Sequence, residues 1–158
     1  MSLALDIPGG IRLELQGLLC DMNGTLTVDG RLDASVAVGL RQLAERLNLY
    51  IMTADTFGTA ALTFAELPVK LIAMPAGVPG AVAKRDFLRT LGVATHAVLG
   101  NGYNDHLMLA EAAIGICVLG REGAHRLALT AADLLVPDPG AALELFLHPR
   151  RLLAGLRN

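Results

Sequence analysis

Short apolar runs alternate with longer amphipathic segments along this chain, and the alternation restricts the fold more than any other feature. The runs lie at residues 17–20, 49–52, 69–73, 97–99, 114–118 and 134–136. Such runs are typical of strands that are covered on both faces of a sheet. Residues 34–47 and 81–91 carry apolar side chains at helical spacing. The pattern predicts an α/β fold with a mainly parallel sheet.

A small hairpin is predicted before the first of these runs. Residues 3–7 and 11–15 flank a Pro-Gly-Gly turn, which favours two short antiparallel strands. The sequence contains no internal repeat, low-complexity segment or linker, and its 158 residues suit one domain. We therefore expect a single domain over residues 1–158.

The composition narrows the class of protein. Basic and acidic residues nearly balance, at 13 and 15, so the clustered basic stripe of a nucleic-acid-binding protein is not expected. No apolar run approaches the ~20 residues of a membrane span, and the N-terminus lacks a signal-peptide pattern. Cys20 and Cys117 lie inside apolar runs, which predicts buried thiols in a reducing compartment. We expect a cytoplasmic protein that binds neither nucleic acid nor a membrane.

Several predicted strands end at residues that can do chemistry. Asp21 follows the run 17–20, Thr53 follows 49–52, and the polar segment 101–105 follows 97–99. Parallel strands bring their carboxyl ends to one edge of a sheet, where ligands collect. Lys84 stands near the start of a predicted helix on the same side. The sequence therefore predicts one site built from three loops and a lysine.

Four motifs stand in the order that is typical of one superfamily. The segment 20–27, Cys-Asp-Met-Asn-Gly-Thr-Leu-Thr, resembles the first motif of the haloacid dehalogenase (HAD) superfamily. Thr53, Lys84 and the segment 100–105, Gly-Asn-Gly-Tyr-Asn-Asp, resemble the second, third and fourth motifs. Thr53-Ala54-Asp55 is similar to the Thr-Gly-Asp of P-type ATPase phosphorylation domains. The resemblance covers residues 17–136 and implies a three-layer α/β/α Rossmannoid fold, like that of the small soluble, capless hydrolases of this group.

The resemblance also implies phosphoryl chemistry. Asp21 would be a nucleophile that forms an aspartyl phosphate, and Lys84 would offset the repulsion between its carboxylate and the phosphate. Thr53 and the main-chain amides of residues 22–24 would donate to phosphoryl oxygens. The phosphate-binding residues implied are Met22, Gly24, Thr53, Ala54 and Lys84; the catalytic ones are Asp21, Asn23, Thr53 and Lys84.

Mg²⁺ is the cofactor that the resemblance implies. This ion prefers oxygen ligands in octahedral geometry. The Asp21 carboxylate, the Asn23 main-chain carbonyl and the Asn101 side chain would supply three of them, and Asp105 would orient a metal-bound water. His106 is interpreted as a helix residue at the rim of the site rather than as a ligand or base.

Two residues depart from the superfamily pattern. Asn23 stands where its phosphatases usually carry the aspartate that acts as general acid and base, and an amide cannot exchange a proton at neutral pH. P-type ATPases also lack an acid at this position. Asn101 stands where an aspartate usually binds Mg²⁺, so weak metal binding is expected. The predicted function is a slow phosphatase or an ATPase-like hydrolase.

The intervals between the motifs are too short for a cap domain. One small flap at residues 26–32, turning at Asp29-Gly30, and one helix fill the first interval. An open mouth suits a phosphorylated substrate that can be macromolecular, or a lid from a neighbouring subunit of a homo-oligomer. A catalytically impaired phosphate- or nucleotide-sensing module is the alternative, and a structural oligomer a weaker one. The apolar segment 141–156 suits either the core or an interface.

Overall fold

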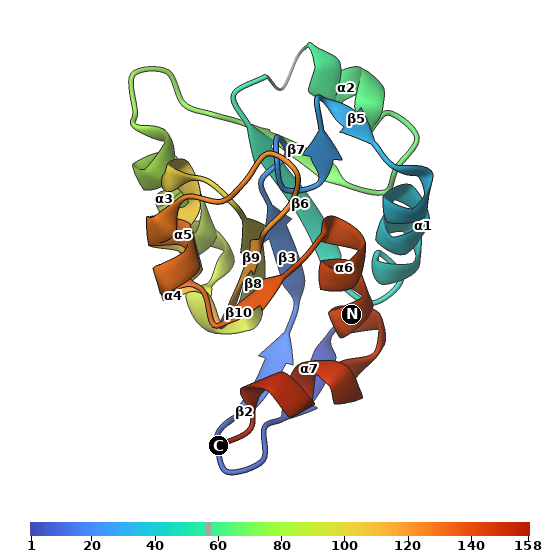
Figure 1. Cartoon of the computed structure of the whole chain (residues 1–158), viewed down its shortest axis with the longest axis vertical. Helices are drawn as coiled ribbons and strands as arrows, with labels where there is room; N and C mark the ends of the chain where they lie inside the picture. Colours follow the sequence, from blue (N-terminus) through green and yellow to red (C-terminus); the bar gives the residue numbers. More distant parts are fainter. Residues whose placement is uncertain (56–57) are drawn as a thin grey trace.

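A six-stranded parallel sheet forms the centre of the computed structural model, which describes residues 1–55 and 58–158 (Figure 1). The strand order is β10-β9-β8-β3-β6-β7, and every neighbouring pair is parallel. The strands are β3 (Gly17–Cys20), β6 (Asn48–Thr53), β7 (Lys70–Ala73), β8 (His96–Gly100), β9 (Ile114–Val118) and β10 (Leu134–Val136). The predicted mainly parallel α/β fold is confirmed.

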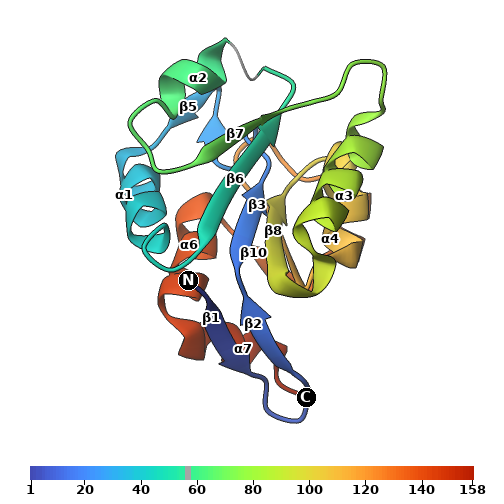
Figure 2. The ribbon, with the colours of Figure 1, turned by 180° about the vertical axis from the view of Figure 1, so that it is seen from behind.

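Helices cover both faces of this sheet and complete three layers (Figure 2). One face packs against α1 (Ala34–Leu43), α6 (Pro139–Leu147) and α7 (Pro149–Leu156). The other packs against α3 (Gly80–Leu91), α4 (His106–Glu111) and α5 (Arg126–Ala131). Within β3, Leu18 and Cys20 face the first layer and Leu19 faces the second, so both sides of this strand are buried.

The N-terminal hairpin lies at the end of the sheet opposite its carboxyl edge (Figure 1). It pairs β1 (Leu3–Asp6) with β2 (Arg12–Leu15), as the sequence predicts. Its inward leucines join the core beside Leu152 of α7. The main-chain amide of Asn158 donates to the Pro8 carbonyl at 3.2 Å, so the last residue lies on the hairpin turn.

Three sequence-based expectations are resolved by the packing. Strands β7 and β10 are the edges of the sheet, so the prediction that every apolar run is covered on both faces is wrong for them, and Leu135 is 51% exposed. Helix α1 ends at Leu43, before the predicted 47, because a turn leads from there into β6. The apolar segment 141–156 contributes Leu143, Phe146 and Leu152 to the core, which favours the intramolecular interpretation.

Short elements lie above the carboxyl edge in place of a cap. The flap pairs β4 (Thr27–Val28) with β5 (Arg31–Leu32) and turns at Asp29 and Gly30, whose φ angles are 51° and 72°. Helix α2 (Thr59–Thr63) follows β6, and residues 74–79 link β7 to α3. No cap domain is inserted among the described residues. Within the same residues, no helix has the length and apolar character needed to cross a membrane.

Candidate active site

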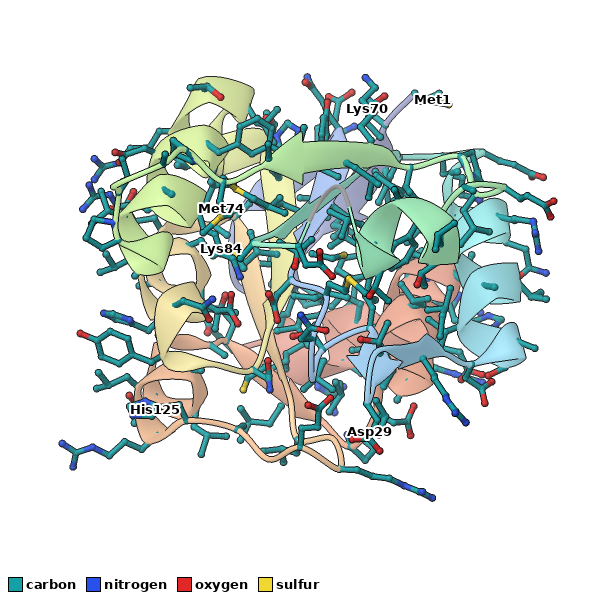
Figure 3. All side chains as sticks on the ribbon, turned by 90° about the horizontal axis from the view of Figure 1, so that it is seen from above. Met1, Asp29, Lys70, Met74, Lys84 and His125 are labelled. Atoms are coloured by element: carbon teal, nitrogen blue, oxygen red, sulfur yellow. The ribbon has the colours of Figure 1, made fainter. Side chains whose placement is uncertain are left out.

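Three adjacent strands bring the predicted site residues to one edge. In the register of the sheet, Cys20 of β3 pairs with Ile51 of β6 and with Leu99 of β8. Asp21, Thr53 and Asn101 therefore end neighbouring strands, and each of the three residues is at least nine-tenths buried. Figure 3 looks down on this edge, with Lys84 extending inward from α3 and Asp29 at the tip of the flap. The predicted convergence of three loops is what the structure shows.

The loop after Asp21 turns sharply around one carbonyl group. The Asp21 amide continues the sheet by donating to the Leu99 carbonyl at 3.0 Å. The Met22 carbonyl then accepts from the amides of Leu26 and Thr27 at 2.9 and 3.1 Å. Gly24 has a φ of 77°, and a Cβ there would collide with the Asn101 side-chain amide. Only glycine fits this close approach between the first and fourth motif loops.

Lys84 holds two carboxylates together at the centre of the site. Its Nζ lies 2.6 Å from Asp21 Oδ1 and 2.7 Å from Asp105 Oδ1. Lys84 lies inside α3, which begins at Gly80. It is only 1% exposed, and the other buried residues of this helix are apolar. A buried lysine is tolerated only with such partners. The geometry brings together the predicted nucleophile and the predicted cation.

The protonation of Asp21 reflects opposing effects. Burial raises its pKa, the Asp105 carboxylate raises it further, and Lys84 and Thr25 offset only part of this, so the pKa is about 6. Burial lowers the pKa of Lys84, but the two carboxylates outweigh it and the net direction is upward. At pH 7 and above, the Asp21 carboxylate is therefore mostly ionised and pairs with the charged Lys84 ammonium.

Removing the Asp21 charge is expected to change how stability depends on pH. A raised carboxyl pKa means that the folded chain keeps a proton that the unfolded chain releases between pH about 4 and about 6. Wild-type stability therefore falls as pH rises through this window, relative to Asp21→Asn. Urea denaturation of both metal-free proteins should show the variant gaining about 1–3 kcal/mol from pH 4 to pH 7. A difference that does not vary with pH would contradict the raised pKa.

Asp105 anchors the fourth motif. Its Oδ2 accepts from the main-chain amides of Asn101 and Gly102, each at 2.9 Å, while Oδ1 accepts from Lys84. The residue is fully buried. Both carboxylate oxygens thus have protein donors, so Asp105 fixes the loop and the lysine. Its predicted role toward a metal-bound water stays a prediction.

Thr25 is a site residue that the sequence reasoning missed. Its Oγ1 lies 3.0 Å from Asp21 Oδ2 and 3.0 Å from Asn101 Oδ1, and the residue is 1% exposed. One hydroxyl proton faces two acceptor oxygens, so it can satisfy only one of them fully. The signal was the Gly-Thr turn itself, where a polar side chain four residues after Asp21 folds back toward it.

Asn101 has a fixed amide orientation. Its Nδ2 donates to the Gly123 carbonyl at 3.0 Å, which leaves Oδ1 on the side of Thr25 and Asp21. Its main-chain carbonyl accepts from the His125 amide at 2.8 Å. Asn101 therefore connects the loop at residues 119–125 to the site. The side-chain hydrogen bond to Gly123 needs an amide donor, which a carboxylate lacks.

The main-chain amides that follow Asp21 differ in whether the described residues supply an acceptor for them. Among the described residues, the amides of Met22 and Asn23 donate to no acceptor, and Met22 is 1% exposed. Asn23 is exposed, so its amide can donate to water, whereas a buried amide such as that of Met22 is rarely left without an acceptor in a folded protein. The Gly24 amide is different, because it donates to the Thr27 carbonyl at 3.0 Å. The Gly24 amide is therefore already used within the protein and is not available for the phosphate contact predicted for it.

The remaining predicted residues lie around these groups. Thr53 is 3% exposed, and its Oγ1 accepts from the Asp55 amide at 3.5 Å. Ala54 and Asn23 are exposed at the mouth. Asp55 Oδ2 accepts from the Thr59 amide at 3.1 Å and so starts α2. His106 stacks with Tyr103 at 4.8 Å between ring centroids, outside the charged cluster, as a rim residue would.

The oxygen atoms of the site fit a hard divalent cation. Asp21 Oδ2 and Asn101 Oδ1 share the Thr25 hydroxyl as their neighbour, and no described residue donates to the Asn23 main-chain carbonyl. No group of three or more His, Cys, Asp or Glu side chains suited to a metal occurs in the described part of the chain. Mg²⁺ also takes amide oxygens, carbonyls and water, so this donor set suits that ion, with only one formal charge.

Comparison with known proteins finds a partial sequence match to a relative and a shared fold with solved structures. No family model matches the chain. An uncharacterized protein of Methanocaldococcus jannaschii is 45% identical over 60 residues, which are 38% of this chain and 64% of that protein. The matched stretch thus spans just under two thirds of that relative's length.

Solved structures share the fold over most of the chain. A Legionella pneumophila protein described as a HAD superfamily (subfamily III A) hydrolase has a TM-score of 0.70 at 17% identity, covering 90% of this chain and 87% of that one. The cobalt-bound deoxy-D-mannose-octulosonate 8-phosphate phosphatase of Haemophilus influenzae has a TM-score of 0.70 at 13% identity, covering 87% and 90%.

A third structure carries ligands of interest. The 3-deoxy-D-manno-octulosonate 8-phosphate phosphatase of Moraxella catarrhalis, in complex with magnesium, phosphate and KDO, has a TM-score of 0.69 at 17% identity. The match covers 89% of this chain and 90% of that one. The chain has the HAD-like Rossmannoid fold that its four motifs indicated.

Proposed function

We propose that this chain is a Mg²⁺-dependent phosphohydrolase that transfers a phosphoryl group to Asp21. The observation that carries the proposal is the surroundings of this carboxylate. Asp21 lies 2.6 Å from the Lys84 ammonium, on a loop whose Met22 and Asn23 amides have no acceptor among the described residues. These groups would bind the oxygens of a phosphate next to a nucleophile. The HAD-like fold, shared with two sugar-phosphate phosphatases, supports the same chemistry.

The first step would form a covalent intermediate. An Asp21 carboxylate oxygen would attack phosphorus as the bond to the leaving oxygen breaks, and the leaving group would take a proton from water. Lys84 and the two main-chain amides would stabilise the charge on the phosphoryl oxygens. Water would then attack phosphorus in the aspartyl phosphate and release inorganic phosphate, which regenerates Asp21.

The chain would hold Mg²⁺ through the Asp21 carboxylate, the Asn23 main-chain carbonyl and the Asn101 side chain. When bound, the ion supplies positive charge that reduces repulsion between carboxylate and phosphate. Thr25 would keep Asp21 Oδ2 and Asn101 Oδ1 in place by its hydroxyl contacts. Asp105 would hold Lys84 in position and orient a metal-bound water, although its own oxygens already accept protein donors.

Turnover assays test the proposal directly. Purified protein should release phosphate from p-nitrophenyl phosphate in the presence of Mg²⁺ and lose this activity with EDTA. Asp21→Asn should abolish turnover, since the amide is a poor nucleophile, while circular dichroism shows an unchanged fold. Equal turnover by the wild type and the variant would contradict a nucleophilic role for Asp21.

The metal affinity should respond to Asn101. Asn101→Asp adds a charge where Mg²⁺ would bind, so calorimetry should find tighter Mg²⁺ binding than in the wild type. The same change removes the donor to the Gly123 carbonyl and places a carboxylate against it. Without metal, the variant should lose about 1–3 kcal/mol of unfolding free energy. Equal Mg²⁺ affinity for both proteins would contradict the ligand role of Asn101.

A second candidate function is a phosphate- or nucleotide-sensing module that binds without turnover. Asn23 and Asn101 favour it, because both depart from the acidic residues of active phosphatases. Calorimetry with phosphate and Mg²⁺ should then show binding, while the turnover assay stays at background. The open edge suits a phosphorylated macromolecule or a lid from a second subunit, and oligomeric state by light scattering tests the latter.

A further inference from the structure

Two Asn-Gly pairs lie on adjacent loops of the site, and the structure restrains them differently. Asn23-Gly24 follows Asp21, and Asn101-Gly102 follows β8. Asparagine before glycine favours spontaneous deamidation, because glycine has no side chain to hinder attack by its own amide nitrogen. In both pairs the asparagine stands where an aspartate is usual in the superfamily. The surroundings of each pair therefore decide where the chain can gain that carboxylate by itself.

The Asn23 side chain has the freedom that this reaction needs. It is exposed at the mouth, and it forms no hydrogen bond within residues 1–55 and 58–158. The Gly24 amide donates to a neutral acceptor, the Thr27 carbonyl, at 3.0 Å. A single neutral hydrogen bond is a weak restraint, so small local openings of the turn release the Gly24 nitrogen. Rotation of the Asn23 side chain then brings its Cγ to that nitrogen.

Asn101 is restrained at both groups that would have to move. Its Nδ2 donates to the Gly123 carbonyl at 3.0 Å, its Oδ1 accepts from Thr25 at 3.0 Å, and the residue is only 9% exposed. The Gly102 amide donates to a carboxylate oxygen, Asp105 Oδ2, at 2.9 Å. Such a charge-assisted bond is stronger than one to a neutral carbonyl and holds the amide proton in place. The same sequence pair is therefore protected in the fourth motif.

We infer that Asn23 is a self-modification site, at which deamidation supplies the general acid and base that the sequence lacks. The Gly24 nitrogen attacks Cγ of Asn23 and closes a succinimide ring, and the side-chain nitrogen leaves as ammonia with the displaced amide proton. Water then opens the ring. Cleavage of the new N–Cγ bond gives aspartate, whereas cleavage at the main-chain carbonyl gives isoaspartate. The inference rests on the proposed function, because the new carboxylate would act in that same reaction.

The two products should differ in activity. Aspartate at position 23 leaves the course of the main chain unchanged and places a carboxylic acid where it can protonate the leaving group. Isoaspartate runs the main chain through the former side chain. The carbonyl of residue 23, which the proposed function assigns to Mg²⁺, then becomes a free carboxylate. The lengthened loop would also disturb Gly24, which lies so close to Asn101 that a Cβ would collide with it.

Ageing of the purified wild-type protein tests this inference. Samples kept in mildly alkaline buffer are taken over time for peptide mapping by mass spectrometry, with isoaspartate counted separately by isoaspartyl methyltransferase labelling. The peptide with Asn23 should become deamidated. The peptide with Asn101 should stay intact in the folded protein and become deamidated in urea. An Asn23 that stays intact, or equal rates for Asn23 and Asn101 in the folded protein, would overturn the inference.

Activity of the same samples connects the modification to catalysis. Turnover of p-nitrophenyl phosphate with Mg²⁺ should rise with the fraction of aspartate at position 23, toward that of fresh Asn23→Asp, about tenfold or more above fresh wild type. Asn23→Gln should show no rise with time, because its longer side chain must close a larger ring and does so much more slowly. A rise in Asn23→Gln, or a wild-type turnover that does not follow the aspartate fraction, would contradict the catalytic role.

Mass and activity separate this inference from the proposed function. If Asn23 becomes deamidated and Asn101 does not, but no sample hydrolyses phosphate esters, the modification site stands and the phosphohydrolase proposal fails with the catalytic role. If fresh protein hydrolyses p-nitrophenyl phosphate and loses this activity in Asp21→Asn, while Asn23 stays intact on ageing, the modification site fails and the phosphohydrolase proposal stands.

Discussion

Lys84→Met is expected to destabilise the metal-free protein by about 3–5 kcal/mol at pH 8 and to abolish phosphoryl transfer. The variant would leave the buried carboxylates of Asp21 and Asp105 without the ammonium that lies 2.6 and 2.7 Å from them. The penalty should shrink at pH 5, because Asp21, whose pKa is about 6, can then take up a proton. Urea denaturation at both pH values measures the change in unfolding free energy.

Lys70→Met is the matched control for this prediction. Lys70 is the chain's other lysine, and it is exposed on β7, with its Nζ 5.3 Å from the centroid of the Tyr50 ring. Loss of such an exposed cation–π contact costs about 0.5–1 kcal/mol. If Lys84→Met loses no more stability than Lys70→Met and keeps its turnover, the buried charge cluster does not have the role assigned to it.

Asn23→Asp is expected to raise phosphatase turnover by an order of magnitude or more, within the ~10²–10⁴ that general acid–base catalysis provides. The change is nearly isosteric. The main chain at this position is fixed by the Gly24 amide on the Thr27 carbonyl, and the Asn23 side chain is exposed at the mouth. The new carboxylic acid could protonate the leaving group and activate water. Steady-state kinetics on p-nitrophenyl phosphate with Mg²⁺ measures the gain.

Two controls protect this measurement. Asn158→Asp adds the same charge at an exposed asparagine far from the site and should leave turnover unchanged. Asn23-Gly24 and Asn101-Gly102 are prone to deamidation, so fresh and aged wild-type protein should be assayed together, with peptide mapping of Asn23. If Asn23→Asp has no effect while Asp21→Asn abolishes turnover, another group supplies the proton, with Asp55 and His106 the first to test.

Much of the fold could be predicted because buried strands leave a simple pattern in the sequence, a short run of apolar residues. The runs at 17–20 and 114–118 coincide with β3 and β9, since uninterrupted apolar residues at this length fit a covered strand. Strand order was not predictable, because apolar periodicity says nothing about neighbours. The edge positions of β7 and β10 therefore came only from the structure.

Part of the candidate site could likewise be predicted from the sequence, and part could not. Asp21, Thr53 and Asn101 were predictable because parallel strands place their ends together. The contacts of Thr25 and of the Asn101 amide depend on how two loops distant in sequence approach each other, which no local pattern encodes. Phosphate contact through the Gly24 amide was expected from the motif, but the turn uses that amide for its own hydrogen bond.

Mass spectrometry after incubation with acetyl phosphate and Mg²⁺ tests the central claim most directly. The wild-type protein should gain the mass of one phosphoryl group on the peptide that contains Asp21. The adduct should persist longer than in Asn23→Asp, because no aspartate stands at position 23 to activate water. Asp21→Asn should gain no adduct. An unmodified Asp21 in wild-type protein that still releases phosphate, or an adduct that remains in Asp21→Asn, would contradict the account.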